Sequence, residues 1–147
     1  MMNAVVREIS PDDYEALVAF WAKIDGIELD STETQERFQF FLMRNKGKSF
    51  LVIENGEIVG ACLASHNGRR GFLNHLAVAQ THRGKGLARK LVDSCLQKLQ
   101  SDGIRKIYAV LLKDNTEGQA FWKHMGWSQH HEYLMMSIEK DITRSID

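Results

Sequence analysis

Apolar positions in the first third of the chain follow two periods, one typical of strands and one typical of helices. Residues 4–9 alternate weakly, as in a strand with one buried face. Residues 10–13, Ser-Pro-Asp-Asp, start a helix, because serine suits the cap, proline the first turn and acids the positive end of the helix dipole. Apolar residues recur at helical spacing from Tyr14 until Gly26, and again around Phe38, so two helices are predicted.

The middle of the chain predicts strands. Two apolar runs with β-branched residues, 49–53 and 58–64, are separated by a polar segment that contains Asn55-Gly56, a pair that suits a tight hairpin turn. We therefore expect an antiparallel strand pair, followed by a further strand over residues 72–79.

The second half of the chain alternates helices and strands. An apolar stripe predicts a long helix over residues 87–99, which ends near Gly103. A strand over residues 104–112, a helix over 117–125 and a closing strand over 133–138 follow. The order β-α-α-β-β-β-α-β-α-β predicts a mixed α/β fold, in which helices flank a central sheet and at least one β-α-β unit pairs its strands in parallel.

The composition is typical of one globular domain, which we place at residues 1–147. The chain carries 19 basic and 19 acidic residues, so no global field attracts nucleic acid or an anionic membrane, and any anion site has to be local. The first residues show no basic segment followed by an apolar core, and no run of roughly 18 apolar residues occurs. We therefore expect a cytoplasmic protein with neither nucleic acid nor membrane among its partners.

The chain has two cysteines, Cys62 and Cys95, far apart in apolar segments and without CxxC spacing. This pattern favours reduced thiols in the core over a disulfide or a metal site. No metal is expected.

A glycine-rich turn, residues 83–86 (Arg-Gly-Lys-Gly), lies between an apolar strand end and the long helix. Glycines let backbone N–H groups approach a phosphate closely, and a helix N-terminus stabilises an exposed anion by about 0.3–1 kcal/mol. The alternative is a turn that only bends the chain tightly. A P-loop pattern is absent, and Arg89 stands where a dinucleotide-binding fingerprint would have its third glycine.

The segment Arg83-x-x-Gly86-x-Ala88, after a strand and at the start of an amphipathic helix, resembles the pyrophosphate-binding motif of the GNAT superfamily of N-acetyltransferases. A second segment matches that family in spacing through Asn115, Gly118, Phe121, Trp122, Gly126 and Trp127. With the order of elements, the resemblance covers nearly the whole chain. It implies the family's mostly antiparallel sheet and an acetyl-CoA-dependent acyltransferase.

The resemblance also implies where the donor, acetyl-CoA, binds. In the family the strand before the turn splays from its neighbour and binds the pantetheine arm, and an N–H group at its end polarises the thioester carbonyl. The turn holds the pyrophosphate, and Asn115 bonds the pantetheine or, alternatively, caps the last helix. The donor-binding residues implied are Leu76, Ala77, Val78, Arg83, Gly84, Lys85, Gly86, Leu87, Ala88 and Asn115.

Trp122 departs from the family pattern, because it stands where the family usually has a tyrosine that protonates the departing thiolate. An indole N–H does not titrate in the useful range. General acid catalysis contributes about 3–5 kcal/mol and positioning of two substrates about 7–11 kcal/mol, so transfer without this acid is expected to be reduced and not abolished.

His75 is the candidate general base, because it lies on the splayed strand and has an ordinary pKa of about 6.5. The alternative is a histidine that faces the wrong side or satisfies a core hydrogen bond. Asn74 beside it is a candidate for orienting the acceptor.

The acceptor is expected to be a primary amine on a small molecule or a peptide. Trp21 and Glu28 are candidate acceptor-binding residues, the first as a cation–π wall and the second within an acidic region between the first two helices. The alternative is a core tryptophan and a solvated acidic helix start. Arg69 and Arg70, just before the donor strand, suit an acidic acceptor instead or form only a turn.

Two functions remain open at this point. The first is an N-acetyltransferase that works by direct attack in a ternary complex, since no cysteine lies on the donor motif. The second is a non-catalytic acyl-CoA-binding sensor, suggested by Trp122. A nucleic-acid-binding module is disfavoured by the balanced charge. Homodimers are common in the family, with the terminal strand and exposed aromatic residues as candidate contacts.

Overall fold

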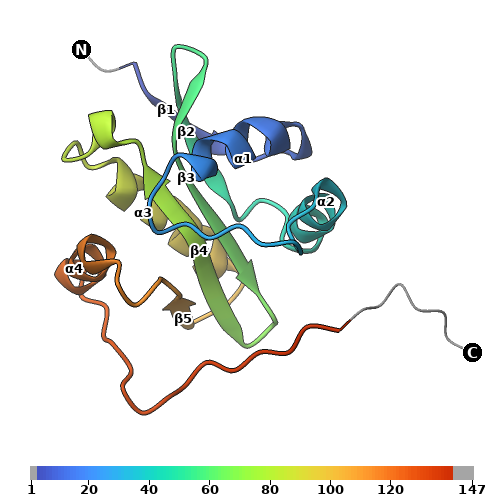
Figure 1. Ribbon diagram of the computed structural model, residues 1–147, viewed down its shortest axis with the longest axis vertical. Helices are drawn as coiled ribbons and strands as arrows, with labels where there is room; N and C mark the ends of the chain where they lie inside the picture. Colours follow the sequence, from blue (N-terminus) through green and yellow to red (C-terminus); the bar gives the residue numbers. More distant parts are fainter. Residues whose placement is uncertain (1–2, 141–147) are drawn as a thin grey trace, which may run out of the picture. The chain divides into compact units, whose positions relative to one another are not determined.

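The computed structural model describes residues 3–140 of the 147-residue chain (Figure 1). Its residues form two compact units, one that ends at Asn115 and one that starts at Thr116. Each unit is described separately below.

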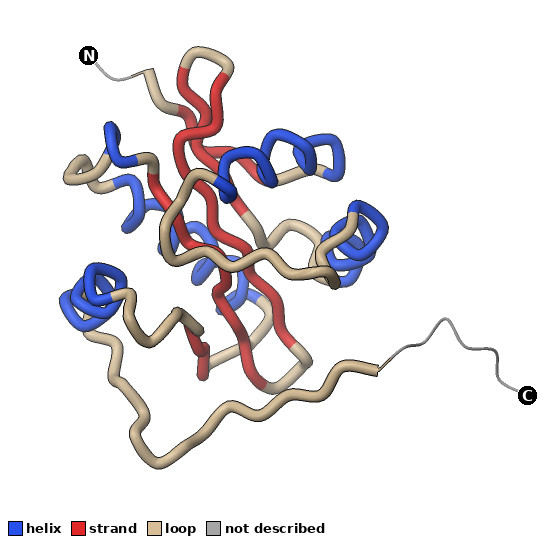
Figure 2. The backbone as a smooth tube through the Cα atoms, in the orientation of Figure 1, coloured by secondary structure: helices blue, strands red, loops and turns tan. Residues whose placement is uncertain are grey.

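The first unit contains a five-stranded sheet with the order β1-β2-β3-β4-β5. Its strands are β1 (Val5–Glu8), β2 (Phe50–Glu54), β3 (Glu57–His66), β4 (Arg70–Val78) and β5 (Lys106–Ala109). The first four strands pair antiparallel, whereas β4 and β5 run parallel. Figure 2 draws the strands in red. The predicted mixed, mostly antiparallel sheet and its parallel pair are thereby confirmed.

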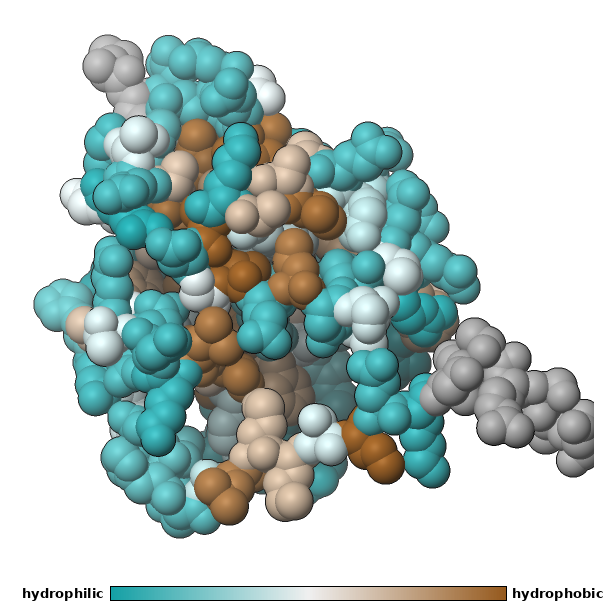
Figure 3. Space-filling view, viewed as in Figure 1, coloured by the Kyte–Doolittle hydropathy of each residue, from teal (hydrophilic) through white to brown (hydrophobic). Residues whose placement is uncertain are grey.

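Helices cover both faces of this sheet. They are α1 (Tyr14–Ala22), α2 (Gln35–Arg44) and α3 (Leu87–Ser101). Leu51 of β2 packs with α1 and α2 in one core cluster, whereas its neighbour Val52 lies with Leu91 of α3 around Gly60. Because successive strand residues point to opposite faces, α1 and α2 cover one face and α3 the other. Figure 3 shows apolar residues gathered over the middle of the face that carries α1, surrounded by hydrophilic side chains.

The start of α1 is fixed by polar contacts that the sequence pattern anticipates. Ser10 N–H donates to Asp13 Oδ2 at 2.7 Å, in the capping arrangement around the short 3-10 turn Pro11–Asp13. Arg7 of β1 donates to both carboxylate oxygens of Asp13, at 2.8 and 2.9 Å, and this bond holds the pKa of Asp13 below its ordinary value. The first strand and the first helix are therefore tied together.

The two cysteines are free and fully buried, as the sequence predicts. Cys95 of α3 lies against β3, where its thiol donates to the carbonyl of Cys62. The neighbouring thiol and burial raise the pKa of Cys62 well above its ordinary value, so this sulfur stays protonated.

The second unit contains α4 (Thr116–His124), followed by extended chain up to residue 140. The prediction of a strand over residues 133–138 is wrong, because no strand among the described residues pairs with this segment. Its side chains are exposed, Leu134 at 90% and Met136 at 88%. A strand exists only where a neighbour accepts and donates its backbone hydrogen bonds, and that neighbour cannot be read from a local pattern. Across residues 3–140, no helix combines the length and the apolar character needed to cross a bilayer.

Leu91 and Leu134 provide a direct test of this burial pattern. Leu91→Ala is expected to lower the free energy of unfolding by about 2–5 kcal/mol, because it leaves a cavity between α3 and the sheet. Leu134→Ala, at an exposed position, is the control and is expected to change it by less than about 0.5 kcal/mol. Urea unfolding measures both values, and equal losses would contradict the packing described here.

Candidate functional site

Strand β4 leaves its parallel neighbour half-way along its length. Pairing with β5 runs from Arg70–Lys106 to Leu73–Ala109 and stops there, whereas β4 continues to Val78. Within the described residues, the second half of β4 therefore has no partner on the β5 side. Its backbone N–H and C=O groups form a short open edge that can bind an extended ligand in the manner of an added strand.

A β-bulge interrupts the other side of β4 at the same place. Asn74 faces Leu63 and Ala77 faces Ala61, so His75 and Leu76 together oppose one residue of β3. His75 has a φ of +54°, a left-handed conformation that costs a non-glycine residue about 1–3 kcal/mol. The bulge turns the backbone where the open edge begins.

Helix α1 holds this bulge in place through Trp21. The indole N–H of Trp21 donates to the carbonyl of His75 at 3.3 Å, and the two rings meet edge to face with centroids 5.1 Å apart. Trp21 is fully buried. In this structure it is a core residue, and it has no exposed ring surface that could form a cation–π wall for an acceptor. Its role here is to position the bulge.

The ring of His75 is half-buried and chemically available. Burial lowers the pKa of His75 below its ordinary value, which keeps the imidazole neutral near pH 7. The ring nitrogens of His75 have no hydrogen-bond partner among the described residues. Every fully buried side-chain nitrogen in that part of the chain has a partner, so the nitrogens of His75 are accessible to solvent. A neutral, accessible imidazole can accept a proton. Asn74 next to it is also half-buried.

The glycine-rich turn follows β4 after a short 3-10 segment, Gln80–His82. Gly84 and Gly86 have φ values of +78° and +79°, which only glycine adopts at little cost, and open space surrounds both. Gly86 is the N-cap of α3. Arg83 Nε donates to the carbonyl of Val78 at 3.1 Å, which ties the turn to the end of β4.

This turn fits a pyrophosphate. The backbone N–H groups of residues 84–89 donate to no acceptor among the described residues, as expected at a helix N-terminus. The exposed side chains of Lys85 and Arg89 add positive charge at the positive end of the dipole of α3. Unpaired donors, absent Cβ atoms and local charge are the features that an anion site requires, here in a chain without net charge.

His82 has a more specific position than the sequence indicates. Its Nε2 lies 2.9 Å from Glu54 Oε1 of β2, and its Nδ1 lies 2.8 Å from Thr81 Oγ1. Both the imidazole and the carboxylate are largely buried, with 15% and 19% of their side chains exposed. The pair anchors the segment before the glycine turn to the sheet, across a sequence separation that leaves no local signal.

Asn115 directly precedes α4 and also lies against the loop after α1. Its Nδ2 is 3.0 Å from the point where a Cβ on Gly26 would stand. Gly26 has a φ of +91°, so both its conformation and this contact exclude a side chain. The structure thus brings Asn115, in the loop that follows β5, to the loop between α1 and α2.

The acidic region between α1 and α2 is mostly solvated. Glu28 is exposed, and Asp30 accepts from the N–H of Thr32 at 2.9 Å within the loop. Glu33 is half-buried, and burial, followed by the charge of Asp30, raises the pKa of Glu33. Thr34 caps α2 by accepting from Arg37 N–H at 3.1 Å, so these acids precede a helix start.

Trp122 lies in the second unit on α4. Its side chain is buried, with 8% exposed, and its ring stacks at a tilt on Trp127 with centroids 4.4 Å apart. The position therefore holds a packed indole without a titratable proton. Among the described residues, no three His, Cys, Asp or Glu side chains gather in a way that could hold a metal ion.

The fold and the site define a class of protein in which a bulged, half-open strand leads into a glycine-rich turn at a helix N-terminus. The chain belongs to the acetyltransferase (GNAT) family, whose model matches residues 6–127. It is 33% identical over 113 residues to an acetyltransferase of Pectobacterium atrosepticum, covering 75% of this chain and 77% of that protein. The family and the enzyme class predicted from the sequence are confirmed.

Solved structures share the fold at low identity. An aminoglycoside N-acetyltransferase, AAC(6')-Iy, in complex with CoA is similar with a TM-score of 0.74 at 15% identity, covering 95% of this chain and 97% of that chain. A transcriptional regulator from Bacillus halodurans C-125 is similar with a TM-score of 0.71 at 18% identity, covering 92% of this chain and 100% of that chain.

The half-buried imidazole of His75 predicts a pH dependence of stability. Because the pKa of His75 is lower in the folded state, the unfolded chain binds the proton first as the pH falls. The stability that depends on the neutral ring is therefore complete above about pH 6.5 and is lost as the pH drops through the folded pKa. His75→Asn removes the titrating group and tolerates the left-handed φ.

We expect the loss of unfolding free energy between about pH 7.5 and about pH 5.5 to be larger in the wild type than in His75→Asn. Urea unfolding at the two pH values measures this difference. His131→Asn changes an exposed histidine and is expected to keep the wild-type difference. If the wild type and His75→Asn showed the same pH dependence, the lowered pKa of His75 in the folded state would be contradicted.

Proposed function

We propose that the protein transfers an acetyl group from acetyl-CoA to a primary amine by direct attack in a ternary complex. The observation that carries the proposal is the continuity of β4: its open, bulged half leads straight into a turn with unpaired N–H groups. A thioester ligand with a pyrophosphate at one end and an amide-rich arm at the other matches this succession of donors. The fully buried cysteines argue against an acyl-enzyme intermediate.

The proposed donor site uses backbone groups more than side chains. Residues 83–88 hold the pyrophosphate, and Leu76, Ala77 and Val78 bind the pantetheine arm along the open edge. A backbone N–H at the bulge stabilises the negative charge that develops on the thioester oxygen. The CoA complex of AAC(6')-Iy supports a CoA donor for this fold. Asn115 contributes a further hydrogen bond to the arm.

His75 is the proposed general base. An attacking amine is protonated near pH 7 and has to lose that proton, and the neutral imidazole on the bulge can take it directly or through one water molecule. Asn74 on the same strand orients the amine. The proposed acceptor is a small molecule or a peptide; a structural neighbour that is named an aminoglycoside N-acetyltransferase supports the small molecule. We place the reaction in the cytoplasm, in line with two cysteines that stay free thiols.

The departing thiolate is expected to leave without a tyrosine. Trp122 cannot protonate it, but a thiol with an ordinary pKa of about 8.5 is a tolerable leaving group, and solvent completes the protonation. Losing a general acid costs about 3–5 kcal/mol of barrier, which is less than the contribution from holding both substrates in place.

A second candidate function is an acyl-CoA sensor that binds the donor without turnover. The observation that favours it is the buried, stacked indole of Trp122 at the motif position where the family usually has its tyrosine. Donor binding is common to both functions, so only turnover separates them.

Thermal unfolding with and without ligand tests the donor site. Acetyl-CoA at about 100 times its dissociation constant is expected to stabilise the folded state by roughly 2.7 kcal/mol, because it binds only the folded chain. CoA should give a similar shift and ATP a smaller one. Gly86→Glu places a bulky, negative side chain in the phosphate turn at a positive φ and should remove the shift.

Its matched control is Gly68→Glu, at a glycine of the β3–β4 turn that also has a positive φ, +90°, and open surroundings. This variant carries the same strain and charge outside the phosphate turn, so it should retain the shift. Absence of any shift with CoA in a folded wild-type protein would overturn the donor site.

Turnover separates enzyme from sensor through Trp122→Tyr. If the missing acid limits an active enzyme, the variant should raise kcat by about tenfold or more, with a rate that falls above about pH 10 as the phenol ionises. A free-thiol assay with a panel of amines measures the rate. Trp127→Tyr alters the same aromatic stack but places its phenol outside the motif position at which the family has its acid, and it should give no such gain.

Absence of turnover in the wild type and in Trp122→Tyr, with donor binding intact, would favour the sensor. A rate gain in Trp127→Tyr equal to that in Trp122→Tyr would show that repacking, and not acid catalysis, is responsible.

A further inference from the structure

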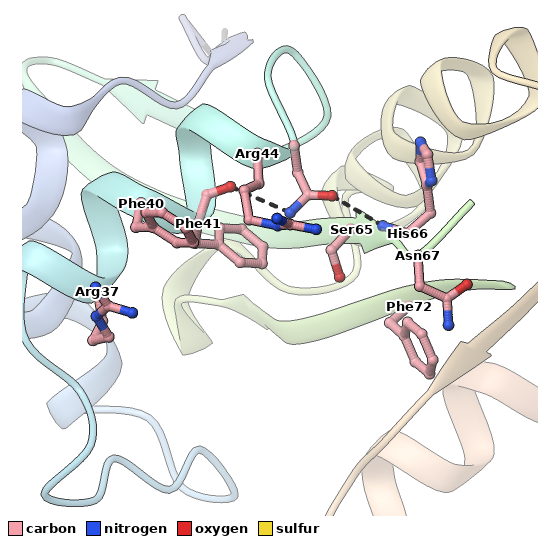
Figure 4. Close-up of a pocket in the computed structure, with 9 residues that line it drawn as sticks. Arg37, Phe40, Phe41, Arg44, Ser65, His66, Asn67 and Phe72 are labelled. Carbon is pink, nitrogen blue, oxygen red and sulfur yellow. Dashed lines mark hydrogen bonds between the residues drawn. The ribbon is translucent and has the colours of Figure 1, made fainter. Parts of the chain in front are cut away.

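A pocket of about 290 Å³ lies between α2 and the β3–β4 hairpin in the first unit (Figure 4). Arg37, Phe40 and Arg44 of α2 line one side, and Ser65, Asn67 and Phe72 of the hairpin region line the other. None of these residues belongs to the donor turn or the bulge.

The pocket walls are held together by buried polar contacts. Asn45, 9% exposed at the end of α2, donates through Nδ2 to the carbonyl of Phe41 at 3.2 Å and accepts from His66 N–H at 3.0 Å. Both bonds are drawn in Figure 4. Phe72 stacks on Tyr108 of β5, with centroids 5.8 Å apart. These contacts join helix α2 to the sheet around the pocket.

Three of the polar side chains that line the pocket carry unpaired donors, whereas the ring of His66 is already paired, with its Nε2 3.0 Å from Asp102 Oδ2. Within residues 3–140, the guanidinium of Arg44 and the hydroxyl of Ser65 have no hydrogen-bond or ion-pair partner. Asn67 uses its side-chain oxygen to accept from Arg69 N–H and Arg70 N–H, both at 2.9 Å, which leaves its NH₂ group free to donate. The lining contains no Asp or Glu.

The two arginines flank one aromatic ring. Arg37 lies 5.0 Å and Arg44 6.0 Å from the ring centroid of Phe40, a cation–π arrangement. The acid nearest to them in the sequence is Glu36, 86% exposed and 3.7 Å from Arg37, a surface contact of small energy. Positive charge is thus concentrated beside apolar rings in a chain that has no net charge. This arrangement suits a ligand in which a carboxylate is attached to an aromatic or apolar group.

The register of β4 relates this pocket to the bulge. Phe72 lines the pocket, and His75 lies three residues further along the same strand. At about 3.3 Å per strand residue the two positions are roughly 10 Å apart. An extended peptide covers that length in about three residues.

We propose that this pocket is the acceptor's anion subsite, and that the acceptor is the amino end of a peptide whose third residue carries a carboxylate. The amine lies at the bulge, and the carboxylate binds Arg44 together with the Ser65 hydroxyl and the Asn67 amide. The inference rests on the proposed function for the position of the amine, whereas the anion subsite stands on the pocket itself.

Binding without turnover tests the subsite. The probes are N-acetylated Gly-Gly-Phe, which cannot be acetylated again, and its C-terminal amide. Isothermal titration with the full chain and saturating CoA should show the free acid binding about tenfold or more tightly than the amide, as for a charge-assisted hydrogen bond. Arg44→Gln should abolish this preference, Arg44→Lys should restore part of it, and Arg105→Gln, at an exposed arginine outside the pocket, should retain it.

Equal binding of acid and amide, no binding of either at millimolar concentration, or an equal loss in Arg105→Gln would overturn the subsite.

Transfer assays then connect the subsite to acetylation. With Gly-Gly-Phe as acceptor, Arg44→Gln should raise KM about tenfold with little change in kcat, and it should leave the amide unaffected. A longer, amidated peptide with glutamate at its third position distinguishes a side-chain carboxylate from a terminal one. Transfer that ignores the carboxylate would overturn this inference and leave the proposed function intact. Arg44-dependent binding without transfer of any acceptor would overturn the proposed function and leave the anion subsite.

Discussion

The structure depends on one conformational constraint, the departure of β4 from its hydrogen-bonded ladder on both sides at nearly the same residue. On the β5 side pairing stops at Leu73, and on the β3 side the bulge begins after Asn74. A left-handed histidine costs free energy, so the bulge persists only because its surroundings determine it. The buried indole of Trp21 does so by donating to the carbonyl of His75. A core helix thereby sets the backbone geometry at the proposed reaction centre.

Strand β4 also organises the charges of this neutral protein. Its carboxyl end leads into the glycine turn at the start of α3, where unpaired N–H groups and Lys85 form the proposed pyrophosphate site. Its amino end lies beside the pocket with Arg37 and Arg44. The bulge lies between these two positive regions. An anionic donor and an anionic acceptor would therefore approach one strand from opposite ends, which is how two substrates of like charge can meet without sharing a binding surface.

The predictions that held are those in which short-range physics decides. The helix start at Ser10 and the hairpin at Asn55-Gly56 follow from local backbone preferences. The turn at Gly84 and Gly86 follows from left-handed φ values that few other residues adopt. The predicted strand over residues 133–138 failed, because its apolar alternation says nothing about whether a neighbouring strand is present. The contact between His82 and Glu54 was missed for the same reason, since the two residues meet only through the sheet.

By itself the sequence determined the class of fold, the family and the glycine-rich turn before α3, because these are encoded in periodicity, turn chemistry and motif spacing along one stretch of chain. Only the tertiary structure decided that Trp21 is a buried support for the bulge, that the ring of His75 is half-buried and unpaired, and that two arginines of α2 face the β3–β4 hairpin across a pocket. These features depend on which side chains meet after the sheet and helices pack. Burial and pairing between distant segments have no local pattern from which they could be read.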